Sequence, residues 1–220
     1  MMAAPNKVVN RGEENMADTS PDIHVESHLE SIELTGKRAK LVGLCESHVE
    51  GLMAVATHQQ IWTYMPTKVA SRGALEALVR DALAAKAAGT EFPFVIIDQA
   101  TNRVVGSTRF LDISRVNKSL EIGWTWLSPD VWRTSINTEC KYLLLKYCFE
   151  TLNTIRVQLK TDSRNVRSQT AIERIGGVKE GVLRKHRILA DGYIRDSVYY
   201  SIVDSEWPTV KERLELMLQR

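Results

Sequence analysis

The sequence predicts a single mixed α/β domain, and three observations support this prediction. Segments with an apolar residue every three to four positions alternate with segments of alternating apolar and polar residues, the patterns of helices and strands. Turn-forming pairs such as Asp191-Gly192 join neighbouring strands into hairpins. The chain has 220 residues, 44% hydrophobic and 25% charged, a length and balance typical of one globular domain with a full core.

The first residues differ in character from the rest of the chain. Residues 1–27 mix charged, Asn, Ser and Pro positions without periodicity, so we expect a disordered tail, with one domain over residues 28–220. An ordered N-terminal arm is the alternative. The beginning of the chain lacks the continuous apolar stretch of a signal peptide, and we therefore expect a cytoplasmic protein.

In the first half of the domain, the sequence predicts two helices between strands. Residues 38–44 (RAKLVGL) have the composition of a strand. Apolar residues recur at helical spacing over 46–57 and again over 71–88, so each segment is expected to be a helix. Two strands over 92–98 and 104–111 flank the sequence DQATNR, whose residues favour turns, and they should form a hairpin.

The second half begins with a strand over 120–127 (LEIGWTWL) and a long helix over 137–152 with an apolar stripe. Apolar and polar residues alternate over 155–160, as in a strand with one polar face. A short helix over 167–175 should end at Gly176-Gly177, because glycine is frequent just past helix ends.

A hairpin and a helix complete the expected order. Strands over 181–189 and 194–203 flank Asp191-Gly192, a strong hairpin signal. Pro208 suits the first turn of a final helix. The elements together predict hairpins arranged around a central strand–loop–helix–strand–helix unit.

Composition argues against several classes of partner and ligand. The net charge of +2 lacks the concentrated basic character of nucleic-acid-binding proteins, and no run approaches the ~18 apolar residues of a membrane span. The three cysteines, Cys45, Cys140 and Cys148, have no C-x-x-C spacing, and the two that share a helical pattern are expected to be buried free thiols. The five histidines are scattered, so we expect no metal site.

The strand–loop–helix junction around residues 128–138 carries the first functional signal. The first-turn amides of a helix have no intrahelical partner, and the helix dipole adds about half a positive charge there, so such junctions can hold phosphate. Arg133 in the loop and Lys141 in the helix would add Coulomb attraction. Many such loops bind nothing, and both interpretations stay open on this observation alone.

Several motifs beyond this junction carry a family resemblance. They are EIGW in the strand, W-x-x-x-x-x-T-E at the loop-to-helix junction, N-x-x-S before an apolar-x-x-x-G, an EG pair, a basic strand, a DG turn, and Asp196 before a Tyr-rich strand. With these motifs, residues 38–207 resemble the RimJ/RimL-type branch of the GNAT acetyltransferases, which includes ribosomal-protein N-terminal acetyltransferases. The resemblance implies the GNAT fold: a central mixed sheet of six to seven strands, helices on both faces, and fourth and fifth strands that splay apart around acetyl-CoA.

The resemblance also implies where the donor binds. Pantetheine would pair with the backbone of Trp126 and Leu127, and the pyrophosphate would lie on the next loop, formed by Arg133, Thr134, Ser135, Ile136, Asn137 and Thr138. This loop departs from the usual Q/R-x-x-G-x-G/A pattern, because Ser135 and Asn137 stand where Gly or Ala is usual. Gly permits close backbone approach, whereas Asn only tolerates left-handed angles better than most residues. We expect acetyl-CoA binding with an altered loop geometry.

Two residues of the short helix have implied roles toward the donor. Asn165 matches the family's pantetheine-binding position, and an Asn before an apolar helical run is also a preferred N-cap. Many GNAT enzymes have a Tyr seven residues later that protonates the departing thiolate, but this sequence has Ile172 there. Ser168 is therefore the candidate proton donor, with an ordinary first-turn Ser as the alternative.

The acceptor side depends on the strand over 120–127 and on a basic strand. Glu121 is where the family often places a catalytic base; a surface position or a pair with Arg109 is the alternative. Trp124 and Trp126 should share one face as core or cleft wall, and Trp124 is the candidate for acceptor binding. The basic run over 184–187 is expected to be a solvated edge, with recognition of an acidic acceptor as the alternative.

The sequence therefore predicts an acetyl-CoA-dependent N-acetyltransferase, with acetyl-CoA as co-substrate and no metal. The acceptor is expected to be a primary amine, on a protein N-terminus or a small molecule, that attacks the thioester directly in a ternary complex. We expect no nucleic acid and no membrane as partners, and a homodimer is an open option. The alternative function is a non-catalytic acyl-CoA-binding regulator on the same fold.

Overall fold

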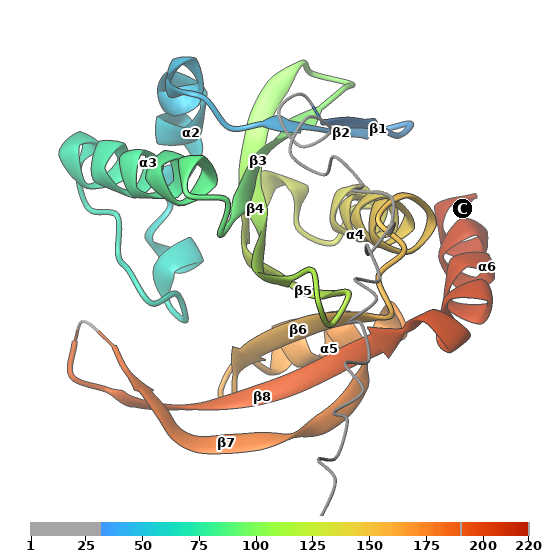
Figure 1. Ribbon diagram of the computed structural model, residues 1–220. Coiled ribbons are helices and arrows are strands. Elements are labelled where there is room, and N and C mark those ends of the chain that lie inside the picture. The colour runs from blue at the N-terminus through green and yellow to red at the C-terminus, as the bar shows by residue number, and fades with distance from the viewer. Residues whose placement is uncertain (1–31, 190, 220) are drawn as a thin grey trace, which may run out of the picture.

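The computed structural model describes residues 32–189 and 191–219, and the expected tail over residues 1–27 lies outside this part of the chain. The described strands form one sheet, shown in Figure 1. Its strands are β1 (Glu33–Thr35), β2 (Ala39–Gly43), β3 (Phe92–Asp98), β4 (Arg103–Ser114), β5 (Ser119–Leu127), β6 (Arg156–Asp162), β7 (Val178–Ile188) and β8 (Ile194–Val203). The helices are α2 (Val49–Ala56), α3 (Arg72–Ala87), α4 (Ile136–Lys146), α5 (Val166–Arg174) and α6 (Trp207–Leu218).

The sheet has eight strands in the order β1-β2-β3-β4-β5-β6-β8-β7. All neighbouring pairs are antiparallel except β5 and β6, which are parallel. The predicted mixed sheet is confirmed, with one strand more than the predicted six to seven. The additional strand, β1, has only three residues, too few for the alternation that makes a strand recognisable in sequence.

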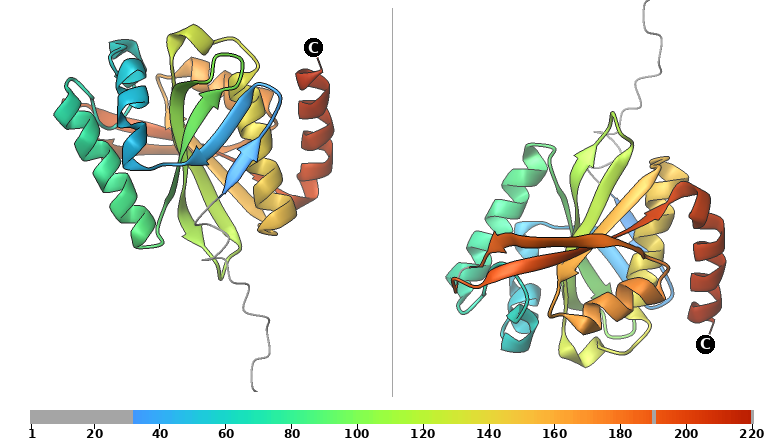
Figure 2. Two further views of the ribbon diagram at one scale, coloured as in Figure 1. Left: turned by 90° about the horizontal axis from the view of Figure 1, so that it is seen from above. Right: turned by 90° about the horizontal axis from the view of Figure 1, so that it is seen from below.

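Helices cover both faces of the sheet, as predicted (Figure 2). Helices α2 and α3 pack on one face, with Leu52, Leu75 and Val95 in their core. Helices α4, α5 and α6 pack on the other face, around the larger core that contains Leu144 and Tyr200. Among the described residues, no helix is long and apolar enough to cross a membrane.

The predicted long helix over 137–152 is interrupted. Helix α4 ends at Lys146 and continues as a π-helical turn over Tyr147–Thr151, where the wider hydrogen-bonding spacing cannot be distinguished in sequence from an α-helix. Cys140 and Cys148 lie in this segment as buried free thiols, as predicted, and burial raises the pKa of both. Cys45 is exposed.

Strands β5 and β6 pair over only a short part of their length and then separate. Their parallel ladder contains three residue pairs and ends at Glu121 opposite Gln158, although β5 continues to Leu127 and β6 to Asp162. A β-bulge lies just beyond, where Trp124 has a left-handed φ of 50° and the β4–β5 register shifts. The splay implied by the family resemblance is confirmed.

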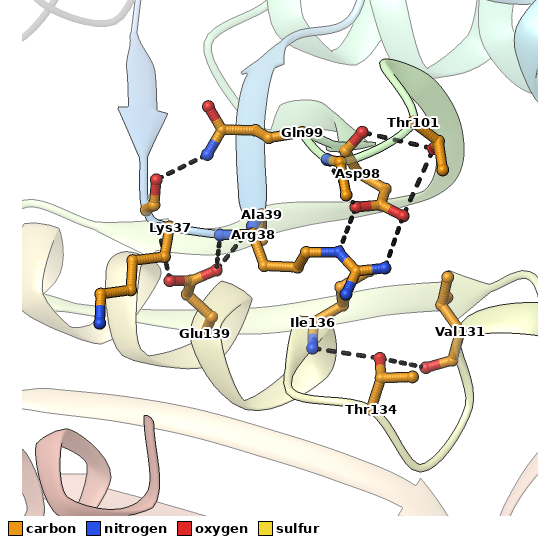
Figure 3. Close-up of polar contacts among 12 residues, drawn as sticks. Lys37, Arg38, Ala39, Asp98, Gln99, Thr101, Val131, Thr134, Ile136 and Glu139 are labelled. Atoms are coloured by element: carbon orange, nitrogen blue, oxygen red, sulfur yellow. Dashed lines mark hydrogen bonds and ion pairs between the residues drawn. The ribbon is translucent and has the colours of Figure 1, made fainter. Parts of the chain in front are cut away.

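A buried carboxylate anchors the start of α4 to the first hairpin (Figure 3). Glu139, in the first turn of α4, accepts backbone N–H groups from Lys37, Arg38 and Ala39 at 2.7, 2.8 and 2.6 Å. A Cβ at Gly36 would lie 2.5 Å from the Glu139 carboxyl carbon, so only glycine leaves room for this contact. The position of the α4 N-terminus therefore depends on the β1–β2 turn.

Removing this carboxylate should destabilise the whole domain. Each hydrogen bond to a charged group contributes about 1.5–3 kcal/mol, and three backbone N–H groups, one of them buried, would lose their acceptor. We expect Glu139→Ala to lower the free energy of unfolding, measured in urea, by about 3 kcal/mol or more. Glu46→Ala, an exposed acidic control, should change it by less than about 0.5 kcal/mol. Equal effects of the two substitutions would contradict this role of Glu139.

Candidate active site

The separated strands leave one edge of β5 without a strand partner. Trp126 and Leu127 pair with Ser107 and Gly106 of β4 on one side, and β6 no longer accompanies them on the other. Backbone groups on this open side are available to an extended ligand. The Leu127 carbonyl already accepts the indole N–H of Trp132 at 2.9 Å, so a ligand donor would have to share that oxygen or displace the indole.

The loop between β5 and α4 presents free backbone amides. Those of Ser135, Asn137 and Thr138 donate to no atom in the described part of the chain, whereas the Ile136 amide donates to the Thr134 hydroxyl at 3.3 Å (Figure 3). Unpaired amides at a helix N-terminus attract anions. The junction therefore has the polarity that a pyrophosphate requires.

The two departures from the usual loop pattern cause no backbone strain. Ser135 has helical angles, with φ −69°, and Asn137 lies within α4. The left-handed residue of the loop is Arg133, with a φ of 64°. Neither position thus needs the conformational freedom of glycine, which is one reason for usually finding glycine in such loops.

Positively charged side chains surround these amides. Arg133 is exposed on the loop. Arg174, at the end of α5, donates to the Thr138 hydroxyl at 2.9 Å, and the Arg167 guanidinium lies 3.8 Å from the ring centroid of Trp132. Lys141 does not belong to this group, since its ammonium donates to Thr125 of β5 at 2.7 Å. The Lys141 ammonium thus contacts β5, and Arg167 and Arg174 of α5 are the positive side chains that contact the loop and the start of α4.

A pocket of about 350 Å³ opens between this loop and the start of α5. It is lined by Gln60, Thr63, Tyr64, Trp132, Arg164, Asn165, Val166 and Arg167. Asn165 is the N-cap of α5, as one interpretation of the sequence predicted, and its Oδ1 accepts the Ser168 backbone N–H at 3.1 Å. This bond places Asn165 and Ser168 side by side at the helix start, with the Asn165 amide nitrogen left to donate.

Ser168 is half-buried in the first turn of α5, and its hydroxyl has no hydrogen-bond partner among the described residues. Ile172 packs in the core. The phenol of Tyr200 reaches α5 but donates to Glu173 and Gln169, and burial raises its pKa to about 12. This phenol is therefore occupied in attaching α5 to the sheet.

Glu121 lies where the β5–β6 ladder ends and is only 1% exposed. Its Oε2 accepts from Gln158 and from the ammonium of Lys160, both at 2.8 Å. Its Oε1 faces Gly123, where an added Cβ would lie 2.8 Å away. Glu121 is thus a buried carboxylate with one occupied oxygen and one that lies against the bulge.

The alternative pairing of Glu121 with Arg109 is wrong. Arg109 instead pairs with Glu91 at 2.6 Å and places its guanidinium 4.7 Å from the ring centroid of Trp124. Trp124 is half-buried under this guanidinium, while Trp126 is buried beside Trp62 with ring centroids 5.2 Å apart. Trp126 is therefore core, and Trp124 keeps a partly open ring next to the bulge.

The basic run over 184–187 is only partly a solvated edge. A register shift between Leu183 and Arg187 forms a bulge at which Lys185 has a φ of 51°. Arg184, Lys185 and Arg187 are exposed, whereas His186 turns inward onto Ser197 at 3.0 Å. Bulges often redirect side chains in this way.

Comparison with known proteins identifies the family. Residues 38–178 match the model of the acetyltransferase (GNAT) domain, which covers well over half of the chain. The protein belongs to the GNAT acetyltransferases. The predicted family is thus confirmed, and proteins of this family use acetyl-CoA as co-substrate.

The GNAT assignment agrees with similar proteins and solved structures. The chain is 33% identical over 96 residues to "Putative ribosomal N-acetyltransferase YdaF" of Bacillus subtilis (strain 168), covering 44% of this chain and 51% of that protein. The aligned part thus spans about half the length of this curated relative. A GCN5-related N-acetyltransferase from Brucella melitensis has a TM-score of 0.80 with 28% identity over 85% of each chain. A "putative acetyltransferase" from T. thermophilus has a TM-score of 0.77 with 36% identity, covering 84% of this chain and 96% of that one.

Two residues that contact predicted site residues were not themselves predicted from the sequence: Lys160 contacts Glu121, and Arg174 contacts Thr138. Lys160 lies on the polar face of β6, and because that face was recognised, its contact with the carboxylate of the adjacent strand could have been inferred. Arg174 lies near the end of α5, far in sequence from the loop it contacts. Nothing local in the sequence predicts that contact.

Lys141 is a buried ammonium behind the bulge. It is 6% exposed, and its hydrogen bond to Thr125 continues to Thr108 at 2.8 Å. Burial lowers the pKa of Lys141 from 10.5 to about 8, with Glu121 acting in the opposite direction. The folded protein therefore holds this charge in an environment that disfavours it.

This lowered pKa predicts a specific dependence of stability on pH. Between pH of about 8 and 10.5 the native state has lost the Lys141 proton that the unfolded chain still binds, so the free energy of unfolding rises with pH in this window. This gain is lost again as the pH falls from 10.5 to about 8. Relative to Lys141→Met, the wild-type free energy of unfolding should increase by about 2–3 kcal/mol from pH 7 to pH 10. For the exposed control Lys146→Met, the difference in free energy of unfolding from the wild type should not change with pH. If the difference in free energy of unfolding between the wild type and Lys141→Met does not change with pH, the pKa of Lys141 is not lowered.

Proposed function

We propose that this GNAT protein transfers the acetyl group of acetyl-CoA to a primary amine by direct attack within a ternary complex. The observation that carries the proposal is the separation of β5 and β6, with free amides at the start of α4 and Glu121 at the point where the strands separate. An anionic donor and a basic acceptor would meet between these two regions.

Donor binding is supported by the positive side chains beside the α4 N-terminus and by the open edge of β5. The free amides of Ser135, Asn137 and Thr138 and the guanidinium groups of Arg133 and Arg174 would hold the pyrophosphate. The other two predicted loop residues, Thr134 and Ile136, would shape the loop through their mutual hydrogen bond. The open edge of β5 at Trp126 and Leu127, with the Asn165 amide, would bind the pantetheine arm.

The acceptor amine must be neutral to attack. An α-amine with a pKa near ~8 needs about 1 kcal/mol to lose its proton at pH 7, whereas a Lys side chain near ~10.4 needs about 4.6 kcal/mol. A carboxylate acting through a water molecule suffices for the first. Glu121 fits this role, since Lys160 occupies Oε2 and leaves Oε1 to accept a proton or orient the amine. This reasoning favours an α-amine as acceptor.

The transfer forms a bond between the amine nitrogen and the thioester carbonyl carbon and breaks the carbon–sulfur bond. N–H groups on the open edge of β5 would polarise the carbonyl oxygen. The amine nitrogen loses its proton to Glu121 through a water molecule. The departing sulfur, a thiolate with a pKa near ~8.5, takes a proton from the Ser168 hydroxyl, which regains one from water, or takes it from water directly. Trp124, half-buried at the bulge, would form part of the acceptor wall.

The acceptor is a protein N-terminus or a small amine. The name of the similar protein YdaF, a ribosomal N-acetyltransferase, favours a protein N-terminus. A non-catalytic acyl-CoA-binding regulator, suggested by the unusual loop, is disfavoured because Ser135 and Asn137 cause no backbone strain there. Thiol release from acetyl-CoA in the presence of a panel of peptides and small amines tests the proposal, and release unaffected by every amine would contradict it.

The same assay should separate acceptor activation from donor binding. Glu121→Gln keeps the size of the side chain but removes its charge, so we expect kcat to fall by roughly 10²-fold, with the acetyl-CoA KM changed by less than about threefold. The acidic limb of the pH–rate profile should also change. Asp112→Asn is the matched control, because Asp112 also lies near Lys160, at 3.8 Å, but is exposed. Similar kcat values for wild type and Glu121→Gln would exclude Glu121 as the base.

Ser168 and Asn165 should have distinguishable effects. Asn165→Ala should mainly raise the acetyl-CoA KM, whereas Ser168→Ala should mainly lower kcat, by about 10²-fold if the hydroxyl protonates the thiolate. Ser168→Cys keeps a weak donor in the same place and should retain more activity than Ser168→Ala. Should Ser168→Ala leave kcat unchanged, water is the proton donor.

A further inference from the structure

A buried arginine on β8, Arg195, has no ion-pair partner in the described part of the chain. Arg195 is 6% exposed, and no hydrogen bond or salt bridge joins its guanidinium to any residue over 32–189 or 191–219. Its Nε is fully buried and unsatisfied. Arginine is rarely buried unless it is paired, because removing a guanidinium from water without compensation is costly.

The carboxylate that attracts Arg195 most strongly is already engaged. Asp162, at the end of β6, attracts Arg195 electrostatically, but Arg164 binds both of its carboxylate oxygens, with Nε at 3.0 Å from Oδ1 and Nη2 at 2.8 Å from Oδ2. Burial lowers the pKa of Arg195, and the charge of Arg187 lowers it further. The field of Asp162 therefore does not compensate for the burial.

A second arginine lies directly opposite Arg195. Arg187 of β7 pairs in register with Arg195, so the two side chains leave the same face of the hairpin. Like charges at directly opposed positions of a sheet are destabilising. The acidic neighbour Asp196 lies on the opposite face of β8 by the alternation of the strand, and its Oδ1 accepts the backbone N–H of Lys185 at 2.7 Å.

The two arginines share a face of the sheet with Glu121. By the alternation of β8, Arg195 lies on the same side as Tyr199, whose ring centroid is 5.9 Å from the ammonium of Lys160. Lys160 pairs in turn with Glu121. Figure 1 shows the β7–β8 hairpin extending toward the segment between α2 and α3. Lys68 of that segment forms an ion pair at 3.1 Å with Asp191 of the hairpin.

We propose that Arg195, with Arg187 opposite it, binds a carboxylate of the acceptor, so that the preferred substrate is an amine that also carries an acidic group. This inference rests on the proposed acetyl transfer to an amine. A guanidinium presents a planar fork of N–H donors that matches a carboxylate, and such paired bonds are strong where water is excluded. Glu121 on this face is paired with Lys160, so the ligand carboxylate would supply the counter-charge that Arg195 lacks in the described part of the chain. Its source is an acidic side chain near a peptide N-terminus or the carboxylate of a free amino acid.

The test compares acceptors that differ only in one carboxylate. With acetyl-CoA and full-length protein, the peptide arm compares Ser-Asp-Ala-Ala-amide with Ser-Asn-Ala-Ala-amide, and the amino-acid arm compares alanine with alaninamide. At least one of these two pairs should be acetylated by the wild type. For that pair we expect Arg195→Met to lower kcat/KM by roughly tenfold or more for the acidic acceptor, and by less than about threefold for the neutral acceptor. Each variant is compared with wild type on the same acceptor, so differences in amine basicity cancel. Arg195→Lys, which keeps the charge but loses the fork, should fall between.

Thermal stability distinguishes ligand binding from a structural role. Removing an uncompensated buried charge should leave the melting temperature of Arg195→Met unchanged or raise it, whereas a structural arginine would lower it. Arg184→Gln, an exposed charge on the same hairpin, is the control and should leave both acceptor preference and stability unchanged.

Three results would overturn the inference. The first is a lowered melting temperature of Arg195→Met. The second is an equal loss of kcat/KM of Arg195→Met toward acidic and neutral acceptors. The third is a change in acceptor preference by Arg184→Gln as large as that caused by Arg195→Met. Absence of transfer to every amine by the wild type would instead contradict the proposed function itself. The arm that responds to Arg195→Met identifies the source of the carboxylate.

Discussion

The short ladder between β5 and β6 is the constraint on which the other features depend. Three residue pairs hold the two halves of the sheet together, and beyond Glu121 and Gln158 the strands separate. In a continuous sheet the backbone of Trp126 and Leu127 would be paired on both sides and could bind nothing. The separation leaves their open edge beside the α4 N-terminus, and the last ladder pair places Glu121 next to it. The bulge at Trp124 lies at this point and changes which face of the sheet the following residues occupy.

Buried charges in this protein differ in how completely they are compensated. Glu139 accepts three backbone N–H groups and holds the helix whose first turn carries the free amides. Glu121 has two partners on one oxygen, and Lys141 has a single hydroxyl as acceptor. Arg195 has none among the described residues. Full compensation stabilises the fold, whereas incomplete compensation costs stability and is common where a ligand completes the site.

Sequence patterns predicted most elements because their signals are local. The alternation of β6, the Asp191-Gly192 turn and the amphipathic spacing of α3 depend only on neighbouring residues, and these elements occur where they were predicted. The errors have equally local causes. Strand β1 is too short to show a period, and the π-helical turn after Lys146 keeps an apolar stripe that resembles an α-helix.

The sequence by itself determined the family, the order of the elements, the identity of Asn165 as a helix cap and the candidate positions of Glu121 and Ser168, because motifs and caps are encoded within a few residues. Only the tertiary structure decided which charges are paired. The choice of Lys160 over Arg109 as the partner of Glu121 arises from contacts between elements that are separated in the chain. The isolation of Arg195 arises because Arg164 binds Asp162 and because the β7–β8 register places Arg187 opposite Arg195. Such contacts depend on strand register and on bulges, and a shift of one residue moves a side chain to the opposite face of the sheet.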